Sequence, residues 1–230
     1  FIPLIYFSFK LRFKNILSLY LIFTLICFQG FIGWYMVSSG LVDRVDVSHY
    51  RLSLHLILAF IILSLILWNY LSLQNIFLSF QKINKAIPII FVFLIFLQIA
   101  IGAFVSGMDA GEIYNTWPLM GLTYFPDDNQ FFNLFDFNVF NDPSLVQFLH
   151  RNLAYLIFLF YIFILFYIYR NKLTNFSYSI NLLGFLLFIQ IILGILTLLF
   201  GAQIYLSSMH QISSIFLVSS SVYFLFEVLF

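Results

Sequence analysis

Charged residues are scarce in this sequence. Only 8% of its 230 residues are Asp, Glu, Lys or Arg, whereas a soluble domain has about 25%. Too few charges are present to cover the surface of a soluble globule. The net charge of +1 and the lack of a basic cluster give no indication of nucleic-acid binding. Because 63% of the residues are hydrophobic, the composition predicts an integral membrane protein.

Cysteine is almost absent. Cys27 is the only one, which excludes a disulfide within the chain, and its apolar surroundings predict a core or lipid-facing position. The stretch "FIPLIYFSF" is not expected to be a signal peptide, because no basic segment precedes it and no small-residue cleavage site follows it. Residues 1–9 are too few to span a bilayer, which takes about 20 residues. We interpret them as the end of a helix whose beginning is missing.

Long apolar runs, by contrast, make up most of the chain and predict an all-α membrane protein with six full spans and an N-terminal helix stub. The connections at 10–15, 73–86 and 170–172 are basic, and the long loop 108–147 is acidic. The positive-inside rule therefore places the basic connections on the cytoplasmic or mitochondrial matrix side. The predicted spans are 15–39, 52–72, 87–107, 148–169, 179–201 and 207–229.

Three of the four histidines occupy equivalent places. His55, His150 and His210 each lie in the first turns of a span that runs from outside to inside, so we expect all three at one depth near the outer face. His49 lies just before a span and is interpreted as interfacial. A matched depth for three histidines favours a shared role.

An internal repeat accompanies the histidines. The pattern Q-x-x-x-G occurs at 29–33, 98–102 and 190–194, each time in the span that precedes a histidine span. The repeating unit is therefore a hairpin of one Gln/Gly helix and one His helix. We interpret its glycines as helix-packing residues, because small residues let spans approach closely. The repeat members are Gln29, Gly33, Gln98, Gly102, Gln190 and Gly194.

The repeat also predicts the domain organisation, since two hairpins make one four-helix bundle. Residues 87–230 would form a complete C-terminal bundle with the outer loop 108–147. Residues 1–72 would form an incomplete N-terminal bundle, and 73–86 an inside linker. The complete protein would then have two pseudo-repeated four-helix bundles and eight spans, with a further histidine before this chain.

Burying an imidazole in a bilayer costs free energy unless it is paired or bound to a metal. A hydrogen-bonded histidine that lines the bundle is the simpler alternative. His150 and His210, however, come from two helices of one bundle and could hold a planar macrocycle between two axial imidazoles. Glu-x-x-His and His-x-x-x-His spacings, which suit di-iron or zinc, do not occur. The pattern favours bis-imidazole haem.

Two arginines close to these histidines allow two interpretations. In the first, Arg51 and Arg151 are ordinary interface arginines that extend toward the headgroups. Alternatively, a guanidinium at this depth is a suitable partner for a haem propionate, because it binds carboxylates bidentately. The sequence leaves both alternatives open.

The outer stretch "DAGEIYNTWPLMG" (109–121) is rich in turn formers and aromatic residues. Tyr114, Trp117 and Trp34 could form an interfacial aromatic belt. In the functional alternative the stretch is a lid over the outer end of the bundle, with Asp109 and Asn115 as polar groups at its mouth.

Six stretches resemble haem A synthase of the mitochondrial and alphaproteobacterial type. They follow the order of that family over nearly the whole chain, and the loop pattern DAG-x-x-YN-x-x-P-x-MG is the most specific of them. The stretches are "QGFIGWYMVSSGL" (29–41), "SHYRLSLHL" (48–56), "GAFVSGMDAGEIYNTWPLMG" (102–121), "VQFLHRNLAY" (146–155), "LGILTLL" (193–199) and "MHQISS" (209–214).

The resemblance implies an enzyme that oxidises the C8 methyl of haem O to a formyl group, giving haem A for cytochrome oxidase. It implies a resident haem b ligated by His150 and His210, and His55 as one ligand of the substrate haem. The second substrate-haem ligand and a glutamate needed for catalysis would lie before this chain, so the chain alone is expected to be inactive. Haem O synthase, an electron donor and a second copy of the chain are candidate partners, in a bacterial or mitochondrial inner membrane.

Two other function classes fit the composition. A diheme b-type cytochrome that only transfers electrons would show the same histidines, and the loop pattern alone favours the enzyme. Duplicated bundles also occur in transporters, but broken helices and paired intramembrane charges, which are typical of that class, are missing from the sequence.

Overall fold

The computed structural model describes residues 13–40, 47–74 and 83–230. Within these ranges the chain is helical, with the remaining residues in turns and one isolated bridge between Met120 and Thr123. The expected helix end at residues 1–9 lies outside the described residues, as do the basic residues 10–12.

Six long helices are present, and each is long and apolar enough to cross a membrane, which confirms the predicted all-α class and the six spans. Short 3-10 helices occupy the outer loop and the α5–α6 turn. The long helices are α2 (Phe13–Gly40), α3 (His49–Leu73), α4 (Ala86–Gly107), α5 (Pro143–Arg170), α6 (Ser177–Leu199) and α7 (Ile204–Leu229). The 3-10 helices are η1 (Ala110–Glu112), η2 (Phe131–Phe135), η3 (Phe137–Asn141) and η4 (Thr174–Phe176).

The start of α5 differs from the prediction. The helix begins at Pro143, five residues before the predicted residue 148. Asp142 caps it, because the carboxylate accepts a hydrogen bond from the Leu145 backbone N–H at 3.0 Å. Proline at the first helical position is favoured because its missing N–H would be unpaired there anyway. The predicted start was the point where the apolar run begins, whereas the helix itself begins earlier, directly after its capping residue Asp142.

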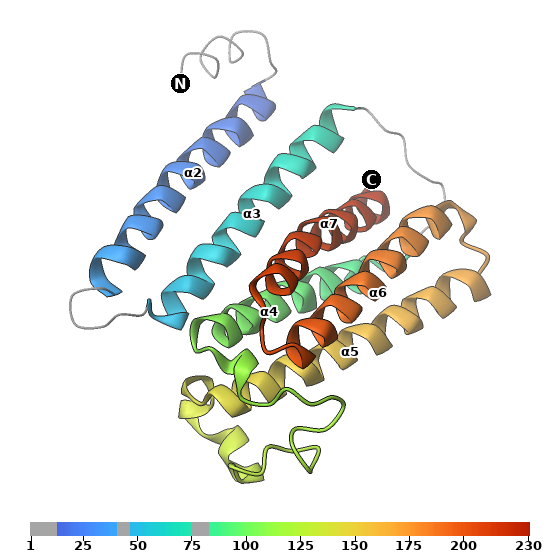
Figure 1. Cartoon of the computed structure of the whole chain (residues 1–230). Coiled ribbons are helices and arrows are strands. Elements are labelled where there is room, and N and C mark those ends of the chain that lie inside the picture. The colour runs from blue at the N-terminus through green and yellow to red at the C-terminus, as the bar shows by residue number, and fades with distance from the viewer. Residues whose placement is uncertain (1–12, 41–46, 75–82) are drawn as a thin grey trace.

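Helices α4 to α7 form a closed ring. Contacts join α4 to α5, α5 to α6, α6 to α7, and α7 back to α4, so α5 and α7 lie diagonally. The α2–α3 hairpin packs on this ring through α3, which touches α4 and α7. Figure 1 shows the starts of α3, α5 and α7 toward the same end of the molecule as the α4–α5 loop. The first turns of the three histidine helices therefore share one end.

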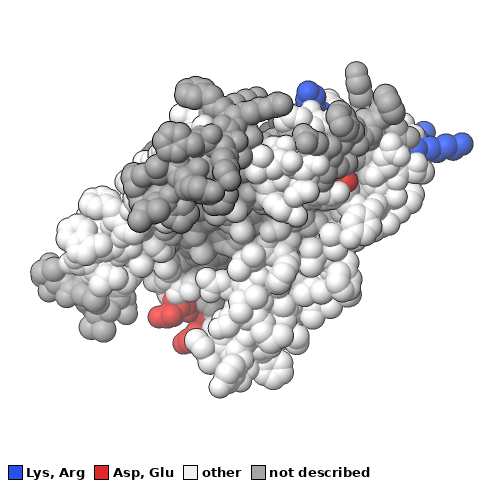
Figure 2. Space-filling view, turned by 90° about the horizontal axis from the view of Figure 1, so that it is seen from above, with Lys and Arg blue, Asp and Glu red and all other residues white. Residues whose placement is uncertain are grey.

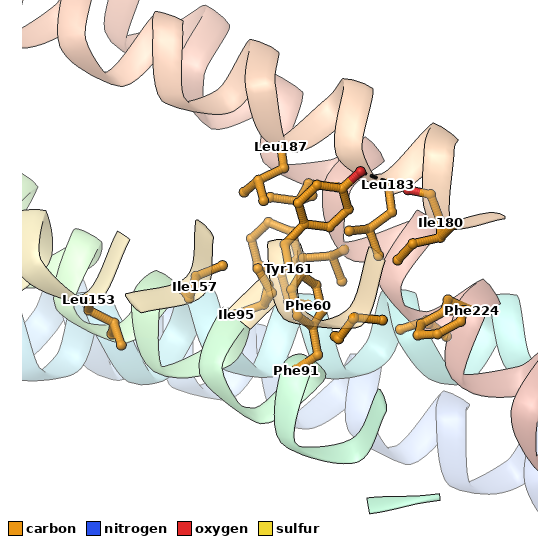
Figure 3. Close-up of a cluster of buried hydrophobic side chains, with 14 of the residues drawn as sticks. Phe60, Phe91, Ile95, Leu153, Ile157, Tyr161, Ile180, Leu183, Leu187 and Phe224 are labelled. Atoms are coloured by element: carbon orange, nitrogen blue, oxygen red, sulfur yellow. Dashed lines mark hydrogen bonds between the residues drawn. The ribbon is translucent and has the colours of Figure 1, made fainter. Parts of the chain in front are cut away.

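The ring is filled by a cluster of buried apolar side chains, part of which Figure 3 shows. Phe91 from α4, Leu183 from α6 and Phe224 from α7 are fully buried there. Tyr161 from α5 crosses to α6, where its hydroxyl donates to the Ile180 carbonyl at 3.4 Å. This core joins α3 to all four helices of the ring, with Phe60 as the contribution of α3.

The outward faces of the helices are apolar too. Phe93, Phe166 and Phe185 expose about 60% of their surface, as expected for side chains that face lipid rather than water. Cys27 is exposed on α2, which fits the predicted lipid-facing position. Figure 2 shows only a few charged side chains on the face that it presents.

Candidate functional site

The three predicted histidines occupy the same level of their helices. His55, His150 and His210 all lie in the second turn, of α3, α5 and α7 respectively. Each faces the preceding helix of its own hairpin through a repeated set of contacts, which we call a clamp: the glutamine and the glycine of Q-x-x-x-G on one helix, and the histidine on the next.

The glutamine holds both the backbone and the ring of its histidine. In the first clamp the Gln29 side-chain amide donates to the His55 carbonyl at 3.0 Å and lies 3.2 Å from His55 Nε2. In the second clamp Gln98 makes the same two contacts with His150, again at 3.0 and 3.2 Å. Hairpins 69 residues apart in the chain therefore repeat one geometry.

The glycine one turn after each glutamine faces the same imidazole. A Cβ atom added at Gly102 would lie 2.9 Å from His150 Cε1, closer than such atoms approach in proteins. The corresponding distances are 3.1 Å at Gly33 and 3.0 Å at Gly194, each to the histidine of its own clamp. The ring is therefore seated against a bare stretch of the neighbouring helix, with the glutamine amide beside it.

The third clamp contains one more residue. The Gln190 amide donates to the His210 carbonyl at 3.0 Å and lies 3.3 and 3.4 Å from the two ring nitrogens. The Ser213 hydroxyl lies within hydrogen-bonding distance of both Gln190 Oε1 and the His210 carbonyl. Both ends of the Gln190 amide are thereby satisfied.

The first two clamps leave polar atoms without partners. Oε1 of Gln29 and of Gln98 is buried and accepts no hydrogen bond from the described residues. Nδ1 of His55 and of His150 is likewise buried and unpaired there. Such atoms cost free energy unless a ligand, water or ion pairs with them.

His150 and His210 belong to the diagonal helices of the ring. Side chains on diagonal helices face one another across the bundle interior, where helical bundles hold cofactors. Among the described residues, no group of three or more His, Cys, Asp or Glu could hold a metal ion by itself. The arrangement offers two imidazoles rather than a full ligand cage.

Arg151 is buried and holds the outer loop. One guanidinium nitrogen donates to the carbonyls of Thr116 at 2.8 Å and Leu119 at 3.2 Å. The other donates to the Tyr114 carbonyl at 2.8 Å and to Gln147 Oε1 at 3.2 Å. All four acceptors are neutral, and the Nε–H is buried without an acceptor in the described part of the chain. A buried guanidinium bound only to neutral acceptors is a favourable place for an anion.

Tyr114 ties the loop to the start of α5. Its hydroxyl donates to Asp127 at 2.7 Å and to Asp128 at 3.0 Å, and Ser144 donates to Asp128 at 2.6 Å. Burial and the two acceptor carboxylates raise the pKa of Tyr114. Burial alone would raise the pKa of Asp128, but hydrogen bonds from Ser144, Tyr114 and Asn129 outweigh it and lower that pKa.

Asn115 fastens the same loop to α6. Its side-chain amide donates to the Gly111 carbonyl and to the Leu198 carbonyl, both at 2.9 Å. Trp117 donates from its indole nitrogen to the Tyr155 hydroxyl on α5 at 2.9 Å. The 109–121 stretch therefore bridges α5 and α6 over one end of the ring.

Asp109 stands where the loop leaves α4. Its backbone is left-handed, with φ of 51°, and its carbonyl accepts from the Glu112 N–H at 3.0 Å. The residue lines a pocket of about 280 Å³ between the start of α3 and the end of α4, away from the clamps. The lining residues are Val47, Leu52, Ser106, Gly107, Met108 and Asp109.

Arg51 and His49 lie among aromatic rings at the start of α3. The Arg51 guanidinium carbon is 4.8 Å from the centre of the Tyr35 ring, a cation–π distance. His49 packs against Tyr50 and edge-on against Phe104, at centroid distances of 4.2 and 5.3 Å. Neither residue contacts a clamp histidine through these interactions.

Sequence reasoning missed the glutamines. The repeat was interpreted as helix packing, but its glutamine and glycine both touch the histidine of the next helix. A usable signal was present, because every Q-x-x-x-G in the chain precedes a histidine span. A glutamine and a glycine four residues apart also share one helix face.

These features define a multi-pass helical membrane protein with histidines at the same level of three of its helices. A sequence model of the COX15-CtaA family, described as cytochrome oxidase assembly protein, matches residues 1–222. The chain belongs to this family, which confirms the resemblance at the family level.

Relatives named heme A synthase cover almost the whole chain. The protein of Pelagibacter ubique HTCC1062 is 48% identical over 97% of this chain and 66% of its own length. Those of Rickettsia bellii OSU 85-389 and Rickettsia africae ESF-5 are 41% and 39% identical over 95% of this chain, and over 67% and 66% of their own lengths. The chain thus spans about two thirds of these relatives. Its helices and its alphaproteobacterial relatives identify a multi-pass inner-membrane protein.

Proposed function

We propose that this protein acts as a haem A synthase, an oxidoreductase that converts the C8 methyl of haem O into a formyl group and so supplies haem A to cytochrome oxidase. Family membership and the name of its relatives support the proposal. The observation that carries it is the pair His150 and Arg151, which are adjacent in the chain. His150 lies against α4 and Arg151 beneath the outer loop, and each has one buried nitrogen without a partner among the described residues.

A haem b fits these residues in our proposal. His150 and His210, on the diagonal helices, would hold its iron, and the Nε–H of Arg151 would donate to a propionate. The neutral acceptors that hold the rest of the guanidinium keep it at the outer end of the ring. When bound, a haem b supplies one-electron redox chemistry.

His55 would contribute one ligand to the substrate haem. Its clamp has the same contacts as that of His150, and its Nδ1 is also buried without a partner in the described chain. Arg51, one turn earlier on α3, would serve the substrate propionates, with Tyr35 beneath its guanidinium. The α2–α3 hairpin would thus form the substrate half, 1–72, and α4–α7 the resident half, 87–230.

The outer loop would close the resident half against water. Its motif residue Tyr114 would hold it to α5, because the Tyr114 carbonyl accepts hydrogen bonds from Gln147 and Arg151, and Asn115 would hold it to α6. Asp109 stands where the loop leaves α4. Excluding water matters because a shielded site strengthens electrostatic interactions and prevents side reactions. Haem O, the lipid bilayer, an electron donor and haem O synthase are the partners that this function would require.

Haem analysis tests the proposal. The protein is expressed from its complete gene beside a haem O source, and the haems are extracted and separated. We expect haem A in the extract and a low-spin haem b spectrum from the purified protein. The variants His150→Ala and His210→Ala should each lose the haem b spectrum. A persistent spectrum in both variants would refute the ligand assignment, and haem b without haem A would favour the electron-transfer alternative.

A further inference from the structure

The three clamps share one contact that does not involve the ring. In each of them the glutamine amide donates to the carbonyl of the histidine residue at 3.0 Å. This carbonyl already belongs to a helix, so the added bond fixes the glutamine relative to the histidine backbone. The amide is thus tied to the backbone of the residue whose side chain it touches.

The imidazole is consequently confined from two sides. The glutamine amide lies 3.2 Å from a ring nitrogen of His150, and Gly102, one turn further along α4, lies against the Cε1 edge. Any side chain at residue 102 would meet the ring. A histidine side chain with free torsions is thereby restricted to a narrow set of orientations.

Plain helix packing does not account for this arrangement. Packing needs only the small residue, and a glutamine whose Oε1 is buried without a partner makes the interface less stable. The Oε1 atoms of Gln98 and Gln29 are both buried without a partner among the described residues. All three clamps also share a contact between the glutamine amide and the imidazole, so orientation of the ring is the role that the contacts support.

The third clamp differs by one hydroxyl. Ser213 lies three residues after His210 and reaches Gln190 Oε1, so the amide cannot turn over without losing that contact. The equivalent residue after His150 is Leu153, and after His55 it is Leu58; neither has a polar side chain. His210 is therefore held by a closed clamp, and His150 and His55 by open ones.

We propose that Gln98 and Gln190 are positioning residues that set the ring orientation of the haem ligands His150 and His210, with Ser213 locking the second of them. The proposal rests on the proposed haem ligation by these histidines. Replacing a residue that hydrogen-bonds to a metal ligand typically changes metal affinity by about 10- to 100-fold. His210 is the ligand of fixed orientation, and His150 is the one that adjusts.

Hemin titration and electron paramagnetic resonance of the ferric protein test this role. The low-spin g values report the mutual orientation of two axial imidazole planes, which a merely structural residue would leave unchanged. Gln98→Met and Gln190→Met keep the side-chain length but remove the amide. We expect hemin affinity to fall by about tenfold or more, with shifted g values and reduction potential. Gln98→Glu and Gln190→Glu should keep much of the native hemin affinity and g values that the methionine variants lose. A protonated carboxyl in the bilayer can donate to the same carbonyl.

The serine gives a test that is gentler on folding. Ser213→Ala should shift the g values in the native background and have little further effect beside Gln190→Met, because that variant already lacks the Oε1 that the hydroxyl reaches and keeps only its contact with the His210 carbonyl. Leu153→Ser adds a hydroxyl to the clamp of His150 and should narrow the low-spin electron paramagnetic resonance signal. Leu153→Ala leaves a similar cavity without a hydroxyl and should not narrow that signal. Gln211→Ala, exposed on α7 beside His210, is the control.

The outcomes separate the two proposals. If the histidine variants lose hemin while both methionine variants and Ser213→Ala keep native affinity, g values and potential, the positioning role is refuted and the haem ligands stand. If hemin binding survives His150→Ala and His210→Ala, the ligand assignment itself fails. If a methionine variant does not fold, Ser213→Ala decides, since unchanged g values would overturn the lock.

Discussion

The two halves of the α4–α7 ring use their buried polar groups differently. The half away from the outer loop is mainly apolar, with Phe91, Leu183 and Phe224 fully buried. The polar residues buried in that half are Ser179, Ser220, Ser221 and Glu227. In the half beneath the loop, the buried Gln147 and Arg151 donate hydrogen bonds to carbonyls of the loop. Polar groups in this second half therefore hold a segment that is distant in the chain.

The largest expected effect lies in the polar half, at Arg151. Arg151→Ala removes the donor from the carbonyls of Tyr114, Thr116 and Leu119. Buried carbonyls without donors should lower the free energy of unfolding by about 3 kcal/mol. Denaturant titration in detergent micelles measures this change. Arg170→Ala, at the exposed end of the same helix, should stay within about 0.5 kcal/mol, and equal losses in the two variants would contradict the anchoring role.

The apolar half is tested at Gly184. A Cβ atom there would lie 1.8 Å from the Tyr161 hydroxyl, so Gly184→Ala forces the tyrosine out of its place in the core. Overpacking of this kind costs about 1–3 kcal/mol. Melting followed by circular dichroism should show the loss. Adding Tyr161→Phe, which removes the nearest atom, should recover part of it; fully additive losses would argue against the clash.

A smaller change is expected in the clamp of the α2–α3 hairpin. Gly33→Ala would bring a Cβ atom to 3.1 Å from His55 Cε1, whereas Gly30→Ala, one turn earlier on the same helix, meets nothing within 4 Å. Only the first variant should displace the imidazole resonances of His55 in nuclear magnetic resonance spectra, with less than about 1 kcal/mol lost in either case. Matching shifts from both glycines would mean that the ring does not rest on α2.

The smallest effect concerns pH and the outer loop. The pKa of Tyr114 is raised in the folded loop, so its contribution to loop stability is present below the unfolded value of about 10 and is lost as the pH rises toward the folded value. The pKa of Asp128 is lowered, so its contribution is present above about 3.9 and is lost as the pH falls through the folded value. Proteolysis of the loop should therefore be slowest between these limits. Tyr114→Phe should remove the alkaline change and leave the acidic one.

The sequence predicted what depends on local pattern. Six spans follow from hydropathy alone, and the shared level of His55, His150 and His210 follows from loop charge and span order. The start of α5 could also be predicted from neighbouring residues, namely the cap Asp142 and Pro143, but the prediction used the start of the apolar run. Hydropathy, loop charge and helix caps are all properties of residues that are close together in the sequence.

The contacts of the site depend on the tertiary structure. Arg151 could not be assigned to the loop carbonyls, because its acceptors lie more than 30 residues away in an irregular segment. The glutamines could not be assigned from Q-x-x-x-G, because the same pattern suits plain helix packing. Ser213 carried no pattern, and it acts only because Gln190 reaches it from another helix.

The bond from Asn115 to the Leu198 carbonyl affects the order of assembly. Its two partners are 83 residues apart, so after Asn115 the ribosome must still make the rest of the loop, α5 and nearly all of α6 before this bond can form. At about 5–20 residues per second, that interval lasts roughly 4–17 s. During that time the loop is fastened to α5 at most, and the outer end of the nascent bundle is uncovered. The loop can cover the outer end of the bundle only after the last turn of α6 has been made.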